Sequence, residues 1–212
     1  MGIPVLILGE SGSGKSASLR NFKEGEVGIL NVAGKPLPFK TTLQSVNINR
    51  KAKEKGWSRY LLIKALIAKA KTTKTFVIDD SQYLLAFDSF DRAAERGFDK
   101  FTDIAVNFKE LIDYVINETP DDYIVYFLHH LEMTDAGKAK AKTIGKMLDQ
   151  QLTVEGLFTI VLLCKADKQR HSFFTQSDGT STAKSPMGMF EYEIDNDLKL
   201  VDDTIREYYN LK

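Results

Sequence analysis

The chain has 212 residues, of which 43% are hydrophobic and 27% charged, a composition typical of one soluble globular domain over residues 1–212. No apolar run is long enough to span a bilayer, and the N-terminus lacks the features of a signal peptide. The single cysteine, Cys164, excludes an internal disulfide framework, and with three histidines it argues against a Cys/His metal site. We therefore expect a cytoplasmic protein without a membrane partner.

Charge is balanced overall but unevenly spread along the chain. Lys and Arg number 29, as do Asp and Glu, yet residues 35–74 hold eleven basic side chains and one acidic one, Glu54. Residues 79–135 carry an excess of acidic side chains, which offsets this positive charge. Such a basic segment indicates either a polyanion-binding face or a solvated helix surface, and charge alone leaves both open.

The first elements in chain order are a strand, a glycine-rich loop and a helix. An apolar run at 3–8 predicts a buried strand, a helix is expected over 16–22, and a second strand over 27–32. Prolines mark 34–39 as a loop. Residues 50–58 are polar and basic, and helical spacing of apolar residues predicts a helix at 60–71.

Further strands and helices alternate through the rest of the chain. Strands are expected at 75–78, 123–128 and 157–163, and helices at 101–117 and 197–209. The polar stretch 132–145 is predicted to be a mobile loop, 171–176 an edge strand or hairpin arm, and 177–185 a loop. This alternation favours an α/β fold with a mainly parallel sheet flanked by helices.

The strongest motif is the loop between the first strand and the helix, which matches the P-loop pattern G-x-x-x-x-G-K-[ST]. Its glycines let backbone N–H groups approach phosphate oxygens, while Lys15 is expected to reach the β- and γ-phosphates and Ser16 to bind Mg²⁺. The alternative is a chance glycine-rich turn. The residues expected to contact the nucleotide are Gly9, Glu10, Ser11, Gly12, Ser13, Gly14, Lys15, Ser16 and Ala17.

The second motif is the strand at 75–78, which ends in Asp79 and Asp80. A strand that ends in an aspartate is what the magnesium shell of a P-loop enzyme requires, so Asp79 is expected to hold the metal through water. Asp80 is the candidate base that polarises the attacking water, although Asp is shorter than the usual Glu. The alternative for both residues is a solvated strand end.

Two further features belong to loops and strand ends. His129 and His130 close a predicted strand, where a polar side chain would face the γ-phosphate, and we favour His130 as the residue that senses hydrolysis. A structural histidine is the alternative. Lys184, beside Pro186 in a loop, is a candidate cationic finger for a neighbouring subunit's site, or an ordinary loop lysine.

With these features in order, the chain resembles the small phage-encoded RecA-like or AAA-type P-loop ATPases, a group that includes single-strand annealing proteins. The resemblance covers most of the chain. The stretches that carry it are GESGSGKS (9–16), FVIDD (76–80), HHLEMTDAGKAKAKTIGKMLD (129–149), EGLFTIVL (155–162) and KSPMGMFE (184–191).

The resemblance implies nucleotide binding by Gly14, Lys15 and Ser16, metal coordination through Asp79, and a sensor-like role for His130. It also implies a ring or filament with ATP between subunits, and makes Lys184 more plausible as a residue that acts across the interface. One departure is notable. RecA-like proteins usually offer a glutamate after the second strand, whereas residues 30–34 of this chain read LNVAG and contain no acid.

The leading prediction is therefore an ATP-binding, ATP-hydrolysing phage recombination protein that binds single-stranded DNA as a homo-oligomer, together with other phage replication or recombination proteins. Trp57 could stack on a base or pack against the next helix. The alternative is a nucleotide-dependent switch or loader that acts on a protein. A small-molecule kinase ranks low because the sequence shows no separate lid rich in arginine: Arg170 and Arg206 are the only arginines after residue 100. The basic residues expected to contact DNA phosphates are Arg50, Lys51, Lys53, Lys55, Lys138, Lys140 and Lys142.

Overall fold

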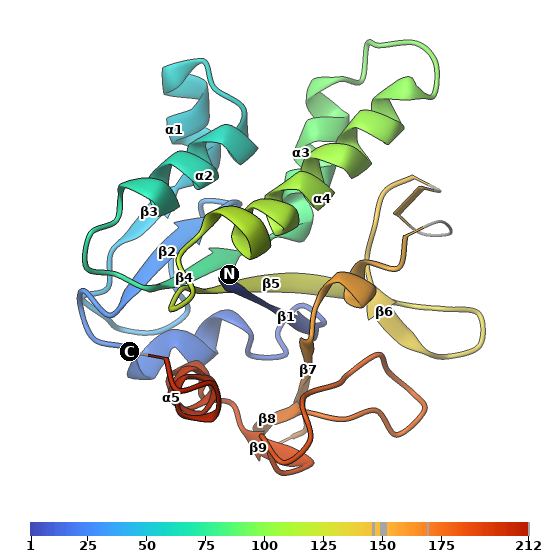
Figure 1. The fold of residues 1–212 in the computed structure, drawn as a ribbon. Coiled ribbons are helices and arrows are strands. Elements are labelled where there is room, and N and C mark those ends of the chain that lie inside the picture. Colours follow the sequence, from blue (N-terminus) through green and yellow to red (C-terminus); the bar gives the residue numbers. More distant parts are fainter. Residues whose placement is uncertain (146, 149–151, 169, 212) are drawn as a thin grey trace.

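The centre of the fold is a mixed, mostly parallel sheet with the order β3-β2-β4-β5-β1-β7-β8-β9, to which β6 is joined through β5 (Figure 1). The computed structural model describes residues 1–145, 147–148, 152–168 and 170–211. Strands β8 and β9 extend the sheet antiparallel from β7, and β6 pairs antiparallel with β5. The strands are β1 (Ile3–Gly9), β2 (Val27–Asn31), β3 (Ser45–Asn47), β4 (Thr75–Asp79), β5 (Ile124–Met133), β6 (Ala139–Ala141), β7 (Ile160–Ala166), β8 (His171–Phe174) and β9 (Glu193–Asp195).

Helices cover both faces of this sheet, as Figure 1 shows with α1–α4 on one side and α5 with η1 on the other. The α-helices are α1 (Ile48–Lys55), α2 (Arg59–Lys69), α3 (Gln82–Asp91), α4 (Asp99–Glu118) and α5 (Leu198–Tyr208), and the 3₁₀ helices are η1 (Ser16–Asn21) and η3 (Val154–Leu157). No helix within the described residues is long and apolar enough to cross a membrane.

Strand β1 shows why both faces are covered. Its residues alternate between two apolar clusters, with Leu6 and Leu8 packed under α1–α4 and Val5 and Ile7 packed under η1 and α5. All four side chains are fully buried. A strand that is apolar on both faces must be covered on both, which accounts for the continuous apolar run in the sequence.

Local signals fix several helix starts. The side chains of Asn47, Ser58 and Asp197 accept hydrogen bonds from backbone N–H groups in the first turns of α1, α2 and α5. These bonds satisfy donors that have no partner inside the helix. Helix α1 then ends at Gly56, which adopts a left-handed conformation with φ of 64°.

The expected α/β arrangement is confirmed, but some elements differ from their predictions. The predicted mobile loop at 132–145 is wrong in part, because β5 continues to Met133 and pairs with β6 as a hairpin. The lysines in and after this stretch favoured a loop and hid the alternation of the hairpin strands. One of these lysines, Lys146, lies outside the described residues. The helix expected at 16–22 is the short 3₁₀ helix η1, and α1 and α3 were not foreseen.

The register brings the chemically interesting residues to one edge of the sheet. Gly9 of β1 lies opposite His130 of β5, and Asn31 of β2 lies opposite Asp79 of β4. Because these strands are parallel, their carboxyl ends meet at the same edge. The topology therefore gathers the glycine-rich loop, the two aspartates and the histidine pair.

Candidate functional site

The glycine-rich loop folds around the ammonium group of Lys15. Lys15 Nζ donates hydrogen bonds to the carbonyl oxygens of Gly9 at 2.7 Å and Glu10 at 2.8 Å. The side chain is buried, and burial lowers the pKa of Lys15, with the charges of Asp80 and Asp79 acting in the opposite sense. A buried cation is thus held by its own loop, in a position from which it can turn toward an anion.

The loop backbone is held from β7 and β8. The carbonyl oxygen of Ser13 accepts hydrogen bonds from His171 Nδ1 at 2.8 Å and from Cys164 Sγ at 3.1 Å. Gly12 and Gly14 have φ values of 81° and 102°, in the left-handed region that favours glycine. The successive N–H groups of such a loop form the kind of nest that binds phosphate oxygens.

Ser16 and Asp79, from separate motifs, are in direct contact. The Ser16 hydroxyl donates a hydrogen bond of 2.8 Å to Asp79 Oδ1. Burial raises the pKa of Asp79, while the bond from Ser16 lowers it. A hydroxyl and a carboxylate beside a phosphate nest are the donor set that magnesium takes in nucleotide sites, so these residues fit that ion.

Asp80 has two partners, the ammonium group of Lys35 and the imidazole of His130. Its Oδ1 accepts from His130 Nε2 at 3.2 Å and its Oδ2 forms an ion pair with Lys35 Nζ at 2.7 Å. Burial would raise the pKa of Asp80, but the bonds from His130 and Lys35 outweigh it and hold that pKa below its usual value. The residue also has φ of 60°, a conformation that Asp tolerates better than most residues.

These side chains line one cavity of about 390 Å³. Lys15, Asp80 and both partners of Asp80 are among its lining residues. The cavity is lined by Ser11, Gly12, Gly14, Lys15, Ser16, Ala17, Lys35, Pro36, Pro38, Asp79, Asp80, His130 and His171. Of the other loop residues, Glu10 and Ser13 line a second cavity of about 430 Å³ that also includes Ser11 and Gly12.

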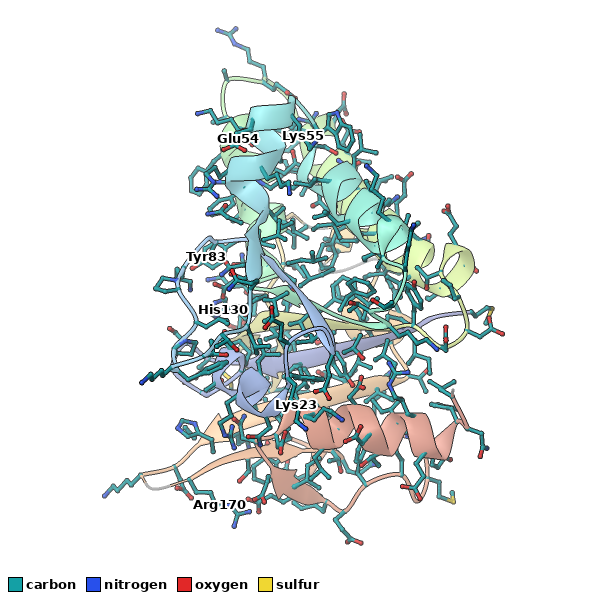
Figure 2. All side chains as sticks on the ribbon, turned by 90° about the vertical axis from the view of Figure 1, so that its left-hand side faces the viewer. Lys23, Glu54, Lys55, Tyr83, His130 and Arg170 are labelled. Atoms are coloured by element: carbon teal, nitrogen blue, oxygen red, sulfur yellow. The ribbon has the colours of Figure 1, made fainter. Side chains whose placement is uncertain are left out.

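The two adjacent histidines differ in environment. His130 lines the cavity, and its ring meets that of Tyr83 edge-on at 5.7 Å, a contact visible in Figure 2. His129 is fully buried, with Nε2 donating to the Lys142 carbonyl at 2.9 Å and Nδ1 bonded to Ser81 Oγ at 2.9 Å. Of the pair, His130 is the one that can contact a ligand in this cavity.

Lys184 does not line this cavity. Its backbone pairs with Val161 near the start of β7, and Val161 lies opposite Leu6 in the register. That position is well before the edge where β1 ends at Gly9. Any contact of Lys184 with a nucleotide would therefore have to be made in a neighbouring subunit.

The lysines of the hairpin and those of α1 form separate groups. Lys138, Lys140 and Lys142 lie on or beside β6, where Lys140 pairs with Glu132 at 3.3 Å. Figure 1 places β6 and α1 at opposite sides of the molecule, and Figure 2 shows Lys55 far above His130. The two groups thus cannot line one groove within a single chain.

The α1 group borders a groove of about 480 Å³ between α1–α2 and α3–α4. Of the predicted DNA-contacting residues, Lys53 lines this groove, and Arg50, Lys51 and Lys55 lie on the same helix. Trp57 is 39% exposed at the rim, 5.0 Å from Lys55 Nζ. It is thus neither fully packed nor fully free, which leaves both of its predicted roles open.

Four residues of the cavity were not among the predicted site residues: Lys35, Pro36, Pro38 and His171. His171 was placed only in a strand, and Lys35 only in a proline-containing loop. Position alone could have indicated Lys35, since it follows a parallel strand at its carboxyl end. Nothing local to the sequence marks His171.

Within the described residues, no cluster of three or more His, Cys, Asp or Glu side chains that could hold a metal is present. Magnesium in nucleotide sites is commonly held by one or two carboxylates together with phosphate oxygens, so a larger cluster is not required. No protein-family model matches the chain, and no curated protein matches it either.

Proposed function

We propose that this chain is a RecA-like P-loop ATPase that binds ATP with Mg²⁺ in the cavity beside Lys15. The single observation that carries the proposal is the hydrogen bond of 2.8 Å between Ser16 Oγ and Asp79 Oδ1. It joins the last residue of the glycine-rich loop to the end of β4, so that a hydroxyl and a carboxylate stand beside a phosphate nest and a buried lysine.

The residues would divide the work as follows. Backbone N–H groups of residues 11–16 would bind the β- and γ-phosphate oxygens, and Lys15 would leave the carbonyls of Gly9 and Glu10 to join them. Ser16 and Asp79 would hold the magnesium ion, which neutralises charge on the phosphate oxygens when bound.

Hydrolysis would place a water on the Asp80 side of the cavity. Attack of its oxygen on the γ-phosphorus breaks the bond to the bridging oxygen and yields ADP and phosphate. Asp80 would accept the proton of that water and return it to solvent after the products leave. His130 donates to Asp80 at 3.2 Å and would register the presence or absence of the γ-phosphate through this bond.

Two features of the site support the proposed oligomer. The loop after β2 offers no acid, and Lys184 lies away from the cavity of its own chain. In a ring or filament, one subunit's Lys184 would add a cation to its neighbour's site, as arginine fingers do in other P-loop enzymes.

Single-stranded DNA is the proposed polymer partner, bound for annealing or strand pairing in phage recombination. Lys138 and Lys142 are exposed on the hairpin, which is attached to the site because Lys142 N donates to the His130 carbonyl at 2.9 Å. In an oligomer, repeated hairpins would present a basic track to phosphates, with sequence-independent and salt-sensitive binding.

The direct experiment measures ATP hydrolysis and particle size at low salt, with and without single-stranded DNA. Wild type should hydrolyse ATP and form larger particles with ATP and DNA, whereas Lys15→Ala should do neither. Reversing the charge of Lys138, Lys140 and Lys142 together should weaken DNA binding and leave ATP binding intact. A wild type that binds no nucleotide would refute the ATPase proposal, and one that binds ATP but ignores DNA would refute the recombination proposal alone.

One observation favours the second candidate, a nucleotide-dependent switch that acts on a protein partner. Both oxygens of Asp80 are already engaged by cationic or hydrogen-bonding partners, which makes it a weak base. Slow hydrolysis would keep the protein in its ATP-bound state for longer, which suits a switch better than an enzyme that must turn over ATP rapidly. Nucleotide-dependent assembly without any response to DNA would support this reading.

A further inference from the structure

Lys35 and Asp80 form an ion pair at the edge of the candidate nucleotide cavity. Lys35 Nζ lies 2.7 Å from Asp80 Oδ2, and the Lys35 side chain is 61% exposed whereas that of Asp80 is 7% exposed. Both residues line the cavity. The carboxylate therefore lies inside it, and the ammonium group reaches it from the solvent side.

The backbone that carries Lys35 is anchored to the sheet. The buried side chain of Asn31 donates from Nδ2 to the Lys35 carbonyl at 2.6 Å and accepts from Gly34 N at 2.6 Å. Asn31 itself pairs with Asp79 in the register of β2 and β4. The base of the Lys35 side chain is thus fixed relative to Asp79, the metal-binding candidate, while most of the side chain is exposed to solvent.

Lys35 also has an aromatic neighbour, Tyr83. Lys35 Nζ lies 5.7 Å from the centre of the Tyr83 ring, which also contacts the ring of His130. Figure 2 shows Tyr83 close above His130. An ammonium group over an aromatic face can shift by small steps without losing all of its stabilisation.

We propose that Lys35 binds the terminal phosphate of a nucleoside triphosphate and, in doing so, leaves Asp80. This inference rests on the proposed nucleotide site. A terminal phosphate carries more charge than a carboxylate and would compete for the ammonium group of Lys35 from across the same cavity, beside Lys15. A diphosphate lacks this terminal phosphate, so Lys35 would stay on Asp80.

The exchange has two consequences for the site. Lys35 becomes the residue that distinguishes triphosphate from diphosphate, because it gains a new partner only with the former. It also frees Asp80 Oδ2 at the moment when a γ-phosphate is present and a water needs a proton acceptor. The loop after β2, which lacks the acid expected there, would thus contribute a cation that controls the acid after β4.

The test is calorimetric titration with the non-hydrolysable β,γ-imido analogue of ATP and with ADP, each with Mg²⁺. Lys35→Met should weaken analogue binding roughly tenfold and leave ADP binding unchanged, because one charge-assisted contact is lost only for the triphosphate. Lys35→Arg should retain the preference. Lys40→Met, an exposed lysine on the same loop that does not line the cavity, is the matched control.

Asp80→Asn adds a second arm that tests the exchange itself. Removal of the carboxylate should tighten analogue binding more when Lys35 is present than in the Lys35→Met background, since only then is an ion pair broken on binding. Equal effects in both backgrounds, or an unchanged analogue-to-ADP preference in Lys35→Met, would overturn the proposal while nucleotide binding by wild type stands. Wild type that binds neither nucleotide would overturn the proposed function and this inference with it.

Discussion

The hydroxyl of Ser16 donates a hydrogen bond of 2.8 Å to Oδ1 of Asp79, although 63 residues separate them in the chain. The bond fixes the direction of both side chains before any ligand is present. A site whose donors are already oriented loses less entropy on binding than one that must assemble. The effect of removing either partner should therefore appear chiefly in metal-dependent binding.

Asp79→Asn should abolish the magnesium dependence of nucleotide binding. The amide keeps the size of the side chain and can still accept from Ser16, but it has no charge for the metal. We expect affinity for the triphosphate in Mg²⁺ to fall to its level in EDTA, and turnover to fall by about 10²–10³. Asp203→Asn, on the exposed face of α5, is the control. The same EDTA sensitivity in Asp79→Asn and wild type would contradict the metal assignment.

Gly14→Ala should be more damaging to nucleotide binding than Gly12→Ala. Both residues have positive φ, so each alanine would cost roughly 1–2 kcal/mol of backbone strain. At Gly14, however, the new Cβ would lie 2.8 Å from His171 Nδ1, whereas at Gly12 nothing lies within 4 Å. Gly14→Ala should therefore push His171 from the Ser13 carbonyl and disturb the loop.

A rescue experiment separates this clash from strain alone. His171→Ala removes the ring that the Gly14→Ala methyl group would meet, so the double variant should recover part of the nucleotide affinity lost in Gly14→Ala. Binding titrations on the two single variants and the double variant measure this coupling. A double variant that binds no better than Gly14→Ala would show that strain, and not His171, is the cause.

The fold class and the centre of the site could be predicted because they depend on local patterns. Apolar runs gave β1 and β4, and the glycine-rich motif between a strand and a helical turn gave Lys15 and Ser16. The step from Ser16 to Asp79 also needed no tertiary information, because parallel strands bring their carboxyl ends to one edge. Such predictions succeed where the spacing of apolar residues in the sequence matches the geometry of the sheet.

Other parts of the site depend on contacts that no local pattern encodes. Lys35 matters because its loop is anchored through Asn31, and His171 because β8 turns back beside the glycine-rich loop. The hairpin at β5–β6 escaped prediction because lysines alternate with alanines in β6, a pattern that also suits a solvated loop. Tertiary pairing decided these cases, as it often does for short strands.

Asp202→Asn should destabilise the fold far more than Asp203→Asn. Asp202 is 3% exposed and accepts hydrogen bonds from Thr75 Oγ1 at 3.0 Å, Tyr126 Oη at 3.1 Å and Arg206 Nε at 2.8 Å. The substitution leaves the charge of Arg206 without its buried counterion, a loss of about 3–5 kcal/mol.

Asp203 provides the matched control on the next residue. Its side chain is 56% exposed and forms an ion pair with Lys199 on the same helix face. Exposed pairs of this kind contribute about 0.3–0.5 kcal/mol. Urea unfolding of the three proteins would measure the difference, and equal midpoints for the two variants would contradict the structural role assigned to Asp202.

Protonation of His129 should make the protein less stable as the pH falls. Burial lowers the pKa of His129 to about 4, whereas the ordinary value is 6.5. Between these two values the unfolded chain binds a proton that the folded chain does not, so stability falls as the pH falls from 6.5 to about 4 and levels off below. The maximum slope for one group is about 1.4 kcal/mol per pH unit.

His129→Gln isolates this contribution. The glutamine amide can still donate to the Lys142 carbonyl, but it does not titrate. Asp79 has the opposite sign, because burial raises its pKa and protonation favours the folded state, so the informative quantity is the difference between variant and wild type. Urea unfolding from pH 6.5 to 4.5 should show a shallower loss of stability in His129→Gln than in wild type. If His129→Gln loses stability with falling pH as steeply as wild type does, His129 is not the group that senses acid.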